Sequence, residues 1–435
     1  MAPGGLEERG SGYGASLSTV KSQAMMQFGA LMALMALCDP NGGLVDVPLS
    51  FILKNRLNLN AEETSQFRIF ASLPLYFSFL FGLMRDRIAQ RQGADKAIIL
   101  YGALFSCAIY CGFALVPLTR EAALTAVILL TTCALFIASA QNGSMAMFGQ
   151  SFNLCSYTSV VWNIFTATPT AAAYLVGGEL SEMSNALDSR SASQALFLAG
   201  ATASLCLALF ALRRPACLAI GDSAEHAISL GVWAELRRFV REPDVRLPLL
   251  IWLLWNFAPG SGTALQYHLQ NNLKATDWQW GLWNALFTAA FVPAYLLFAA
   301  LSRRFDLKVL LRWGAVVAIP QYAPLLLVNS VTDALAVAAA IGALGGLATA
   351  AIVDLIMRSC PKGLEGTTMM VASSVYFVSL RSSDLVGSYL YDRYGGFSIC
   401  VAATISVYAL ILPVQGLLDP RILVNHDRKV GGKKA

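Results

Sequence analysis

Long apolar runs alternate with short polar segments along almost the whole chain. Twelve runs are each close to the roughly 20 apolar residues that a helix needs to cross a bilayer. They predict an all-α integral membrane protein with twelve transmembrane helices, at residues 23–53, 65–84, 97–117, 122–142, 155–177, 193–212, 245–269, 278–301, 307–328, 332–357, 367–390 and 396–416. The first run is longer than a straight span requires, which indicates a tilted or broken helix. A weakly polar stretch from Gln141 to Ser156 is expected to separate the fourth helix from the fifth.

Composition excludes a soluble fold. Apolar residues make up 56% of the 435 residues and charged residues 13%, whereas soluble domains carry about 25% charged residues. The nine cysteines are scattered and form no CxxC pair, so we expect small packing residues rather than disulfides or a metal site. The first 21 residues are polar and rich in Gly and Ser, so no short cleavable signal peptide is expected.

Basic residues fall mostly on one side of the predicted membrane. If both termini lie inside, the cytoplasmic loops and tail collect Arg85, Arg87, Arg91, Lys96, Arg213, Arg214, Arg237, Arg238, Arg241, Arg303, Arg304, Lys308, Arg358, Lys362, Arg421, Arg428, Lys429, Lys433 and Lys434. The opposite loops hold only Lys54, Arg56, Arg120, Arg190, Lys274 and Arg393. Because cytoplasmic loops carry an excess of Lys and Arg, we expect an inner or plasma membrane protein with both termini cytoplasmic. The net charge of +5 then reflects topology and not nucleic-acid binding.

The longest polar connection divides the twelve helices into six plus six. Within it, an apolar face at helical spacing predicts an amphipathic helix on the inner membrane surface, formed by Val232, Trp233, Leu236, Phe239 and Val240. The predicted organisation is a cytoplasmic tail (1–22), a six-helix bundle (23–212), a cytoplasmic linker (213–244), a second six-helix bundle (245–416) and a basic cytoplasmic tail (417–435).

The first and seventh runs share a break rich in Pro and Gly. Pro40, Gly43 and Leu53 correspond to Pro259, Gly262 and Leu269 when a three-residue length difference is allowed. These prolines and glycines are therefore candidate hinges. Two six-helix halves related by an internal repeat are the architecture of the major facilitator superfamily, in which solute sites lie between the halves.

Motifs for catalysis or ATP hydrolysis are missing from the sequence. His226, His268 and His426 lie in separate regions, with no HExxH and no GxxxxGK[ST]. We therefore expect no enzyme activity, no metal and no cofactor. The pair Gly342 and Gly346 forms a GxxxG, which in a membrane helix indicates close helix contact.

Ionisable residues inside the apolar runs are the candidate binding groups. A charge at mid-bilayer costs about 2.5–3.5 kcal/mol, so it needs a partner, water or a function. Asp39 lies directly before the first break. Its carboxylate either couples transport to an ion or contacts the substrate, or it only finds its hydrogen-bond partners within the break. Asp46 lies at a depth similar to that of Arg68, so the two form either a structural ion pair or part of a binding site.

The second half contributes a further set of candidates. Arg381 and Asp384 lie three residues apart on one helix face, as an intrahelical pair or, for Arg381, as a contact to a substrate anion that it can grip with two hydrogen bonds. Gln266 and His268, beyond the second break, complete the polar set. Trp255, like Trp162, Trp252, Tyr267 and Tyr376, either stacks on a ligand or packs in the bundle.

Charged clusters at helix ends are candidate conformational latches. Gly82, Arg85 and Asp86 end the second helix, and a similar cluster from Leu301 to Asp306 ends the eighth. They form either a charge clamp or a plain positive-inside loop. Asp354 and Arg358, four residues apart at the end of the tenth helix, form a gate or a structural contact, and Glu365 is assigned to the same side.

Short motifs throughout the chain resemble the folate–biopterin transporter family of the major facilitator superfamily. They are Pro48-Leu49-Ser50-Phe51 to Leu57-Asn58-Leu59, Leu73-Pro74-Leu75-Tyr76, Phe81-Gly82-Leu83 to Asp86, Leu253 to Pro259, Tyr267 to Leu273, Asp354-Leu355, Cys360 to Thr367 and Ser373 to Tyr376. The chain departs from the family pattern in helix four, where Ser139 to Ser144 contains no carboxylate, and in helix two, where Leu75 and Ser78 replace a Trp and a Lys.

This resemblance implies a secondary carrier that works by alternating access and takes up a folate, a pterin or a related organic anion, with a proton as the coupling ion. The expected partners are a small solute, the lipid bilayer and the coupling ion, with the chain functional as a monomer. Two other functions stay open: a permease for muropeptide-like or peptide solutes, and a non-transporting membrane receptor on the same fold.

Overall fold

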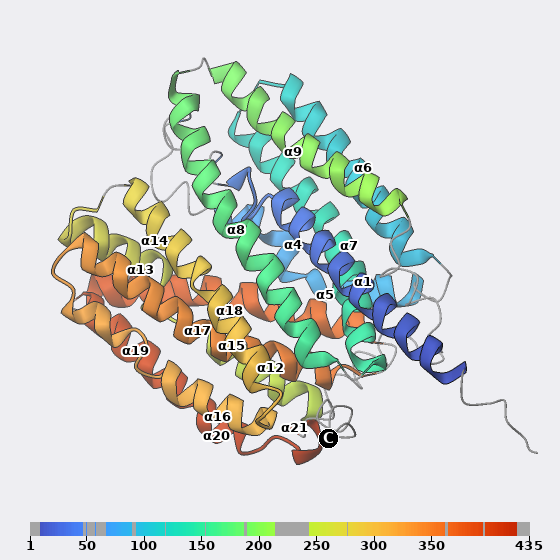
Figure 1. Ribbon diagram of the computed structural model, residues 1–435. Helices are drawn as coiled ribbons and strands as arrows, with labels where there is room; N and C mark the ends of the chain where they lie inside the picture. Colours follow the sequence, from blue (N-terminus) through green and yellow to red (C-terminus); the bar gives the residue numbers. More distant parts are fainter. Residues whose placement is uncertain are drawn as a thin grey trace, which may run out of the picture.

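The computed structural model describes residues 9–46, 49, 57, 67–88, 93–117, 119–152, 154–186, 189–213, 243–275, 277–361, 364–394 and 396–423. All regular elements in these ranges are helices. Figure 1 shows two bundles side by side, one from the blue-to-green first half of the chain and one from the yellow-to-red second half. The amphipathic helix predicted near Val232–Val240 lies outside the described residues.

The described helices of the first half form six segments near the predicted positions. They are α1 (Arg9–Cys38), α4 with α5 (Leu73–Tyr76, Ser78–Ile88), α6 (Ala94–Leu115), α7 (Arg120–Ser151), α8 (Cys155–Ala186) and α9 (Ser189–Leu212). The described helices of the second half form six more: α12 to η2 (Pro243–Asn256, Gly262–Tyr267, His268–Asn272), α14 with α15 (Asp277–Ala289, Phe291–Leu301), α16 with η3 (Leu307–Ala318, Ala323–Leu327), α17 (Val331–Ser359), α18 (Glu365–Arg393), and α19 with α20 (Phe397–Ala409, Ile411–Gln415), followed by the short α21 (Pro420–Leu423).

Several predicted boundaries differ from the structure, and the differences in the first and fourth helices bear on the site. The first helix extends back to Arg9 instead of beginning at 23, because a helix that leaves the bilayer needs no apolar side chains to continue. The fourth helix continues through the polar stretch to Ser151. Its polar residues there, including Gln141 and Ser144, are buried, so they mark a helix face that points into the bundle and not a loop.

Both strongly apolar and less apolar helices meet at the boundary between the halves. Seven described helical segments are long and apolar enough to cross a membrane, in α6, α7, α9, α14–α15, α16–η3, α17 and α19–α20. The less apolar or broken segments, among them α5 and α18, pack across the boundary between the halves, where α5 contacts α18 and α8 contacts α14, α15 and α17.

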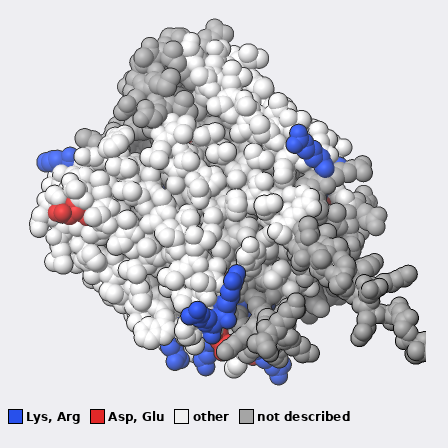
Figure 2. Space-filling model, in the orientation of Figure 1, with Lys and Arg blue, Asp and Glu red and all other residues white. Residues whose placement is uncertain are grey.

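The outer surface suits a lipid environment. Large apolar side chains such as Phe105, Leu297 and Leu385 are exposed there. Figure 2 shows a wide, mostly uncharged face with isolated charged side chains at its left and upper right edges. A cluster of blue Lys and Arg side chains lies at its lower edge, near the C-terminal end of the chain in Figure 1. We call this end of the bundle, where α5 and α17 end and α8 and α18 begin, the closed side.

A glycine of each Pro-Gly break and the carbonyl of Pro259 are closely packed against neighbouring atoms. A Cβ on Gly43 would collide with the Asp39 carbonyl oxygen and lie 2.7 Å from that of Leu37, so only glycine fits directly over the end of α1. At the second break Gly262 has a φ of +57°, and the Asp384 carboxylate lies against it. The Pro259 carbonyl contacts Gly387 of α18.

The predicted GxxxG is a helix contact. A Cβ on Gly342 would collide with the Phe287 carbonyl, and one on Gly346 would lie 3.0 Å from the Phe291 Cα. These two glycines of α17 therefore hold the junction between α14 and α15 at close range.

Candidate functional site

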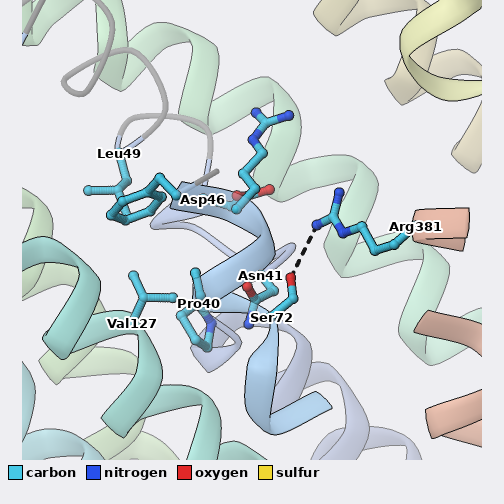
Figure 3. Close-up of a pocket in the computed structure, with 10 residues that line it drawn as sticks. Pro40, Asn41, Asp46, Leu49, Ser72, Val127 and Arg381 are labelled. Atoms are coloured by element: carbon cyan, nitrogen blue, oxygen red, sulfur yellow. Dashed lines mark hydrogen bonds between the residues drawn. The ribbon is translucent and has the colours of Figure 1, made fainter. Parts of the chain in front are cut away.

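A cavity of about 140 Å³ lies where the broken first helix meets the second helix and Arg381 of the other half. Figure 3 shows Arg381 entering from one side and pointing toward Ser72, with Pro40, Asn41 and Asp46 on the other. The lining residues are Pro40, Asn41, Asp46, Leu49, Phe67, Arg68, Ala71, Ser72, Val127 and Arg381. Four predicted residues, Pro40, Asp46, Arg68 and Arg381, therefore meet at one cavity.

The helix break itself builds one wall of the cavity. The backbone N–H of Asn41 donates to Asp39 Oδ1 (2.9 Å), so this carboxylate satisfies an amide that the break leaves without a helical partner. The Asn41 side chain donates in turn to Thr131 Oγ1 of α7 (2.8 Å). Asp39 is not among the lining residues, but its carboxylate interacts electrostatically with that of Asp46.

Charges from both halves face each other across the cavity. Asp46 interacts electrostatically with the guanidinium groups of Arg68, from its own half, and Arg381, from the other. Arg381 Nη2 donates to Ser72 Oγ (3.3 Å), and Nη1 lies 3.7 Å from Asp384 Oδ2. Ser72 precedes α4 without using its hydroxyl to cap that helix, which leaves the oxygen available to Arg381.

Other predicted binding residues lie away from the cavity. Trp255 is buried, donates to Thr349 Oγ1 (3.0 Å) and stacks on Tyr408 with 5.0 Å between ring centroids. His268 stacks on Phe397 (4.4 Å), and its Nδ1 lies 3.0 Å from Asn272 Nδ2. Gln266, in α13, is half-buried and does not line the cavity.

On the closed side, Arg85 is the centre of a buried charge network. Its Nε donates to Asp95 Oδ1 (2.8 Å) and its Nη1 to Asp86 Oδ1 (2.9 Å). The second Asp95 oxygen accepts from Arg85 Nη2 and from the Ser144 hydroxyl. A Cβ on Gly143 would lie 2.6 Å from the guanidinium carbon, so the helix-four stretch without a carboxylate forms the surface on which Arg85 lies.

Asp86 joins the two halves. Its Oδ1 accepts from the Gly366 N–H (3.1 Å), and its Oδ2 accepts from the N–H and the hydroxyl of Thr367 (2.7 Å each). These donors belong to the first turn of α18, where a carboxylate is favoured by the helix dipole. Gly82 allows this approach, because its Cβ would lie 2.7 Å from the Gly366 carbonyl oxygen. We call Gly82, Arg85, Asp86 and their partners the first latch.

A second set of contacts joins the halves at the start of α8. Asp354 Oδ1 accepts from Arg358 Nε (2.8 Å), while its Oδ2 and Arg358 Nη2 each lie 2.8 Å from the Ser156 hydroxyl of the first half. Gln150 Nε2 adds bonds of 2.9 Å to the carbonyls of Met357 and Cys360. We call these contacts the second latch. Glu365, the first residue of α18, is buried nearby and interacts electrostatically with Cys360.

In the described parts of the chain, hydrogen bonds between the halves extend from the Ser72–Arg381 contact to the closed side. Between that contact and the latches, the Ser78 and Ser374 hydroxyls lie 2.7 Å apart, and the Ser159 hydroxyl donates to the Ala350 carbonyl (3.0 Å). The halves are therefore fastened together from the cavity to one end of the bundle.

Of the known families, sequences and structures, only structures are similar to this chain. No protein-family profile matches the chain, and no curated protein sequence matches it. The structure is similar to that of FucP, a major facilitator superfamily transporter in the outward conformation (TM-score 0.65, 14% identity, 91% of this chain and 99% of that chain). It is also similar to a bacterial homologue of the iron transporter ferroportin in the outward-facing state (0.65, 15%, 91% and 98%) and to the human organic anion transporter MFSD10 (0.59, 14%, 91% and 99%).

The fold is therefore that of the major facilitator superfamily transporters. Together with the apolar helices, it makes this chain an integral, multi-pass membrane protein.

Proposed function

We propose that this chain is a secondary active transporter that works by alternating access and takes up a small organic anion together with protons. The observation that carries the proposal is the placement of Arg68 and Arg381, one from each half, at a single cavity. A solute held between the halves is what alternating access requires. The fastening of the closed side supports a state in which the cavity faces the opposite side.

The direction of opening follows from charge. The exposed basic residues Arg303, Arg304, Lys308 and Arg421 lie on the closed side, and an excess of Lys and Arg marks the cytoplasmic face of a membrane protein. We infer that the closed side is cytoplasmic and that the cavity of this conformation faces outward. The similarity to two transporters in outward-facing states supports the same assignment.

Cavity size bears on the substrate. A volume of about 140 Å³ is close to the roughly 150 Å³ of an apolar cavity that holds one benzene molecule. A volume of this size accommodates one end of a solute, such as a carboxylate with a small ring. The folate or pterin class implied by the sequence resemblance would therefore occupy the cavity with one end only. The neighbour named as an organic anion transporter agrees with an anionic solute.

Coupling to protons is assigned to the carboxylate pair Asp39 and Asp46. The two groups interact electrostatically at the edge of the cavity, so together they offer a place for one exchangeable proton. Asp46 also faces both arginines. Loading a proton on this pair changes the charge that a substrate anion meets, which links the two fluxes.

Uptake into proteoliposomes under an imposed pH gradient tests the proposal. The panel contains folate, a pterin carboxylate, small monocarboxylates and a muropeptide. We expect gradient-dependent accumulation of at least one anion, at least tenfold less of it with Arg381→Ala, and no change with Arg312→Ala, an exposed arginine of α16. Accumulation of the peptide alone would favour the permease alternative. A receptor would be favoured if no solute were transported and if Asp39→Asn and Arg381→Ala left the solute flux unchanged.

A further inference from the structure

Arg85 of the first half and Arg381 of the second half have very different surroundings. Arg85 gives two parallel hydrogen bonds to Asp95 and a third to Asp86, and its side chain is 1% exposed. Arg381 has one long bond to Ser72 and a 3.7 Å approach to Asp384, and its side chain is 30% exposed. Its Nε is buried without a hydrogen-bond partner among the described residues.

This difference indicates that the hydrogen-bonding capacity of the Arg381 guanidinium is only partly used. A guanidinium carries five donors in a fork that matches a carboxylate, and paired bonds to a carboxylate are the strongest that it makes. Arg85 makes that arrangement with Asp95. The Arg381 side chain has, among the described residues, a hydrogen bond to a hydroxyl at 3.3 Å and a 3.7 Å approach to a carboxylate, but no paired bonds to a carboxylate. The geometry therefore leaves room at Arg381 for a carboxylate from outside the chain.

The charge lining the cavity points to the same chemistry. Two guanidinium groups, of Arg68 and Arg381, meet one carboxylate, of Asp46. Asp39 interacts with Asp46 from the edge of the cavity, and Tyr174 of α8 is also within electrostatic range of Asp46. Asp46 is the only carboxylate among the described lining residues, and it interacts with both arginines.

We infer that this cavity is a subsite for a single carboxylate group, gripped by Arg381 and Arg68 from opposite halves, and that Asp46 is the internal counter-ion which the incoming carboxylate displaces. The inference rests on the proposed function and narrows it to solutes with a carboxylate end. It also gives that carboxylate a mechanical role, because a group held by both arginines ties the halves together on the cavity side.

Binding to the purified full-length protein in lipid nanodiscs tests the subsite. Isothermal titration compares benzoate with benzamide, which has the same ring and no charge. Wild type should bind benzoate and not benzamide. Asp46→Asn should bind benzoate about tenfold more tightly, since the competing carboxylate is gone, and Arg381→Lys should bind it about tenfold more weakly, since the paired bonds are lost. Asp392→Asn, the same change at an exposed carboxyl near the end of α18, should match wild type.

Several outcomes overturn the inference: equal binding of benzoate and benzamide, no benzoate binding at all, or an Asp46→Asn protein that binds benzoate no better than wild type. If Asp46→Asn does not give a monodisperse protein, the Arg381→Lys comparison decides, and unchanged benzoate affinity there overturns it. Benzoate binding without flux of any anion in proteoliposomes would reject the proposed function while leaving the subsite intact. Flux of an anion without benzoate binding would support the proposed function and reject the subsite.

Discussion

The Asp86 carboxylate, at the end of α5, accepts two 2.7 Å hydrogen bonds from Thr367, one from its backbone N–H and one from its hydroxyl. The two residues belong to different halves of the bundle and are 281 positions apart. One side chain of the first half therefore caps a helix of the second half. Separating the halves on the closed side must break this cap, so its strength would help to set the balance between the two states of the proposed transporter.

Asp86→Asn should shift that balance toward opening of the closed side. An amide keeps one acceptor but loses the charge that favours the start of α18. Losing a helix cap costs about 0.5–2 kcal/mol, and one or two kcal/mol correspond to a factor of about 5–30 in population. The rate at which a membrane-impermeant maleimide labels Cys360, in a protein with no other cysteine, reports the opening. An unchanged labelling rate would show that the cap does not hold this side closed.

Gly82→Ala should also favour opening, by a steric route. The new Cβ would lie 2.7 Å from the Gly366 carbonyl oxygen and the Thr367 Cα, and overpacking of this kind costs about 1–3 kcal/mol. The penalty falls only on the closed arrangement. Gly112→Ala on α6, where a Cβ meets nothing within 4 Å, is the matched control. Cys360 labelling should rise in the first variant and stay at the wild-type rate in the second.

Cys360 should be slow to react in the closed arrangement at any ordinary pH. This residue lies between α17 and α18, outside the spans, and burial raises the pKa of its thiol well above the usual range, with the Glu365 carboxylate adding to the shift. The thiolate is the reactive form, and a free cysteine with a pKa of about 8.5 would be half thiolate at that pH. In a protein whose only cysteine is Cys360, we expect labelling to remain slow at pH 8.5 and to become faster when Asp86→Asn is added. Rapid labelling of Cys360 at pH 8.5 without that substitution would contradict a buried Cys360.

Gly43→Ala tests the first hinge. A Cβ at this position would lie within 2.8 Å of three carbonyl oxygens at the end of α1, those of Asp39, Leu37 and Ala36. The backbone of the break must move to accept it, so we expect a loss of about 1–3 kcal/mol in stability. Thermal unfolding in detergent should give a clearly lower midpoint, while Gly281→Ala, in open space on α14, should not. Equal midpoints would mean that the break is loosely packed.

The positions of the helices and of both breaks could be predicted because their signals are local. Apolar runs, Pro and Gly each act on neighbouring residues, so Pro40 and Pro259 could be paired without coordinates. The spacing of Asp354 and Arg358 likewise predicts the i,i+4 pair seen at 2.8 Å. The start of α1 at Arg9 could not be predicted from hydropathy, because helical structure continues where the apolar pattern stops.

Contacts between distant segments had no such signal. Asp86 could be marked as a charge at a helix end, but Thr367 is an ordinary residue until the two halves meet. Asn41 and Ser72 were also missed, since a single Asn or Ser in an apolar run has no periodicity to distinguish it. Trp255 shows the opposite case: its chemistry suits stacking on a ligand, but packing against Tyr408 places it inside the second half.

Movement between two states is the central claim, and a cross-link across the halves tests it most directly. Ser78 of α5 and Ser374 of α18 have hydroxyl oxygens 2.7 Å apart, so Ser78→Cys with Ser374→Cys, in a protein lacking other cysteines, should form a disulfide. In proteoliposomes, oxidation should abolish uptake of the anion that wild type accumulates, and reduction should restore it. Each single variant should keep its uptake under the same oxidant. Full uptake with the cross-link formed would contradict alternating access by this chain.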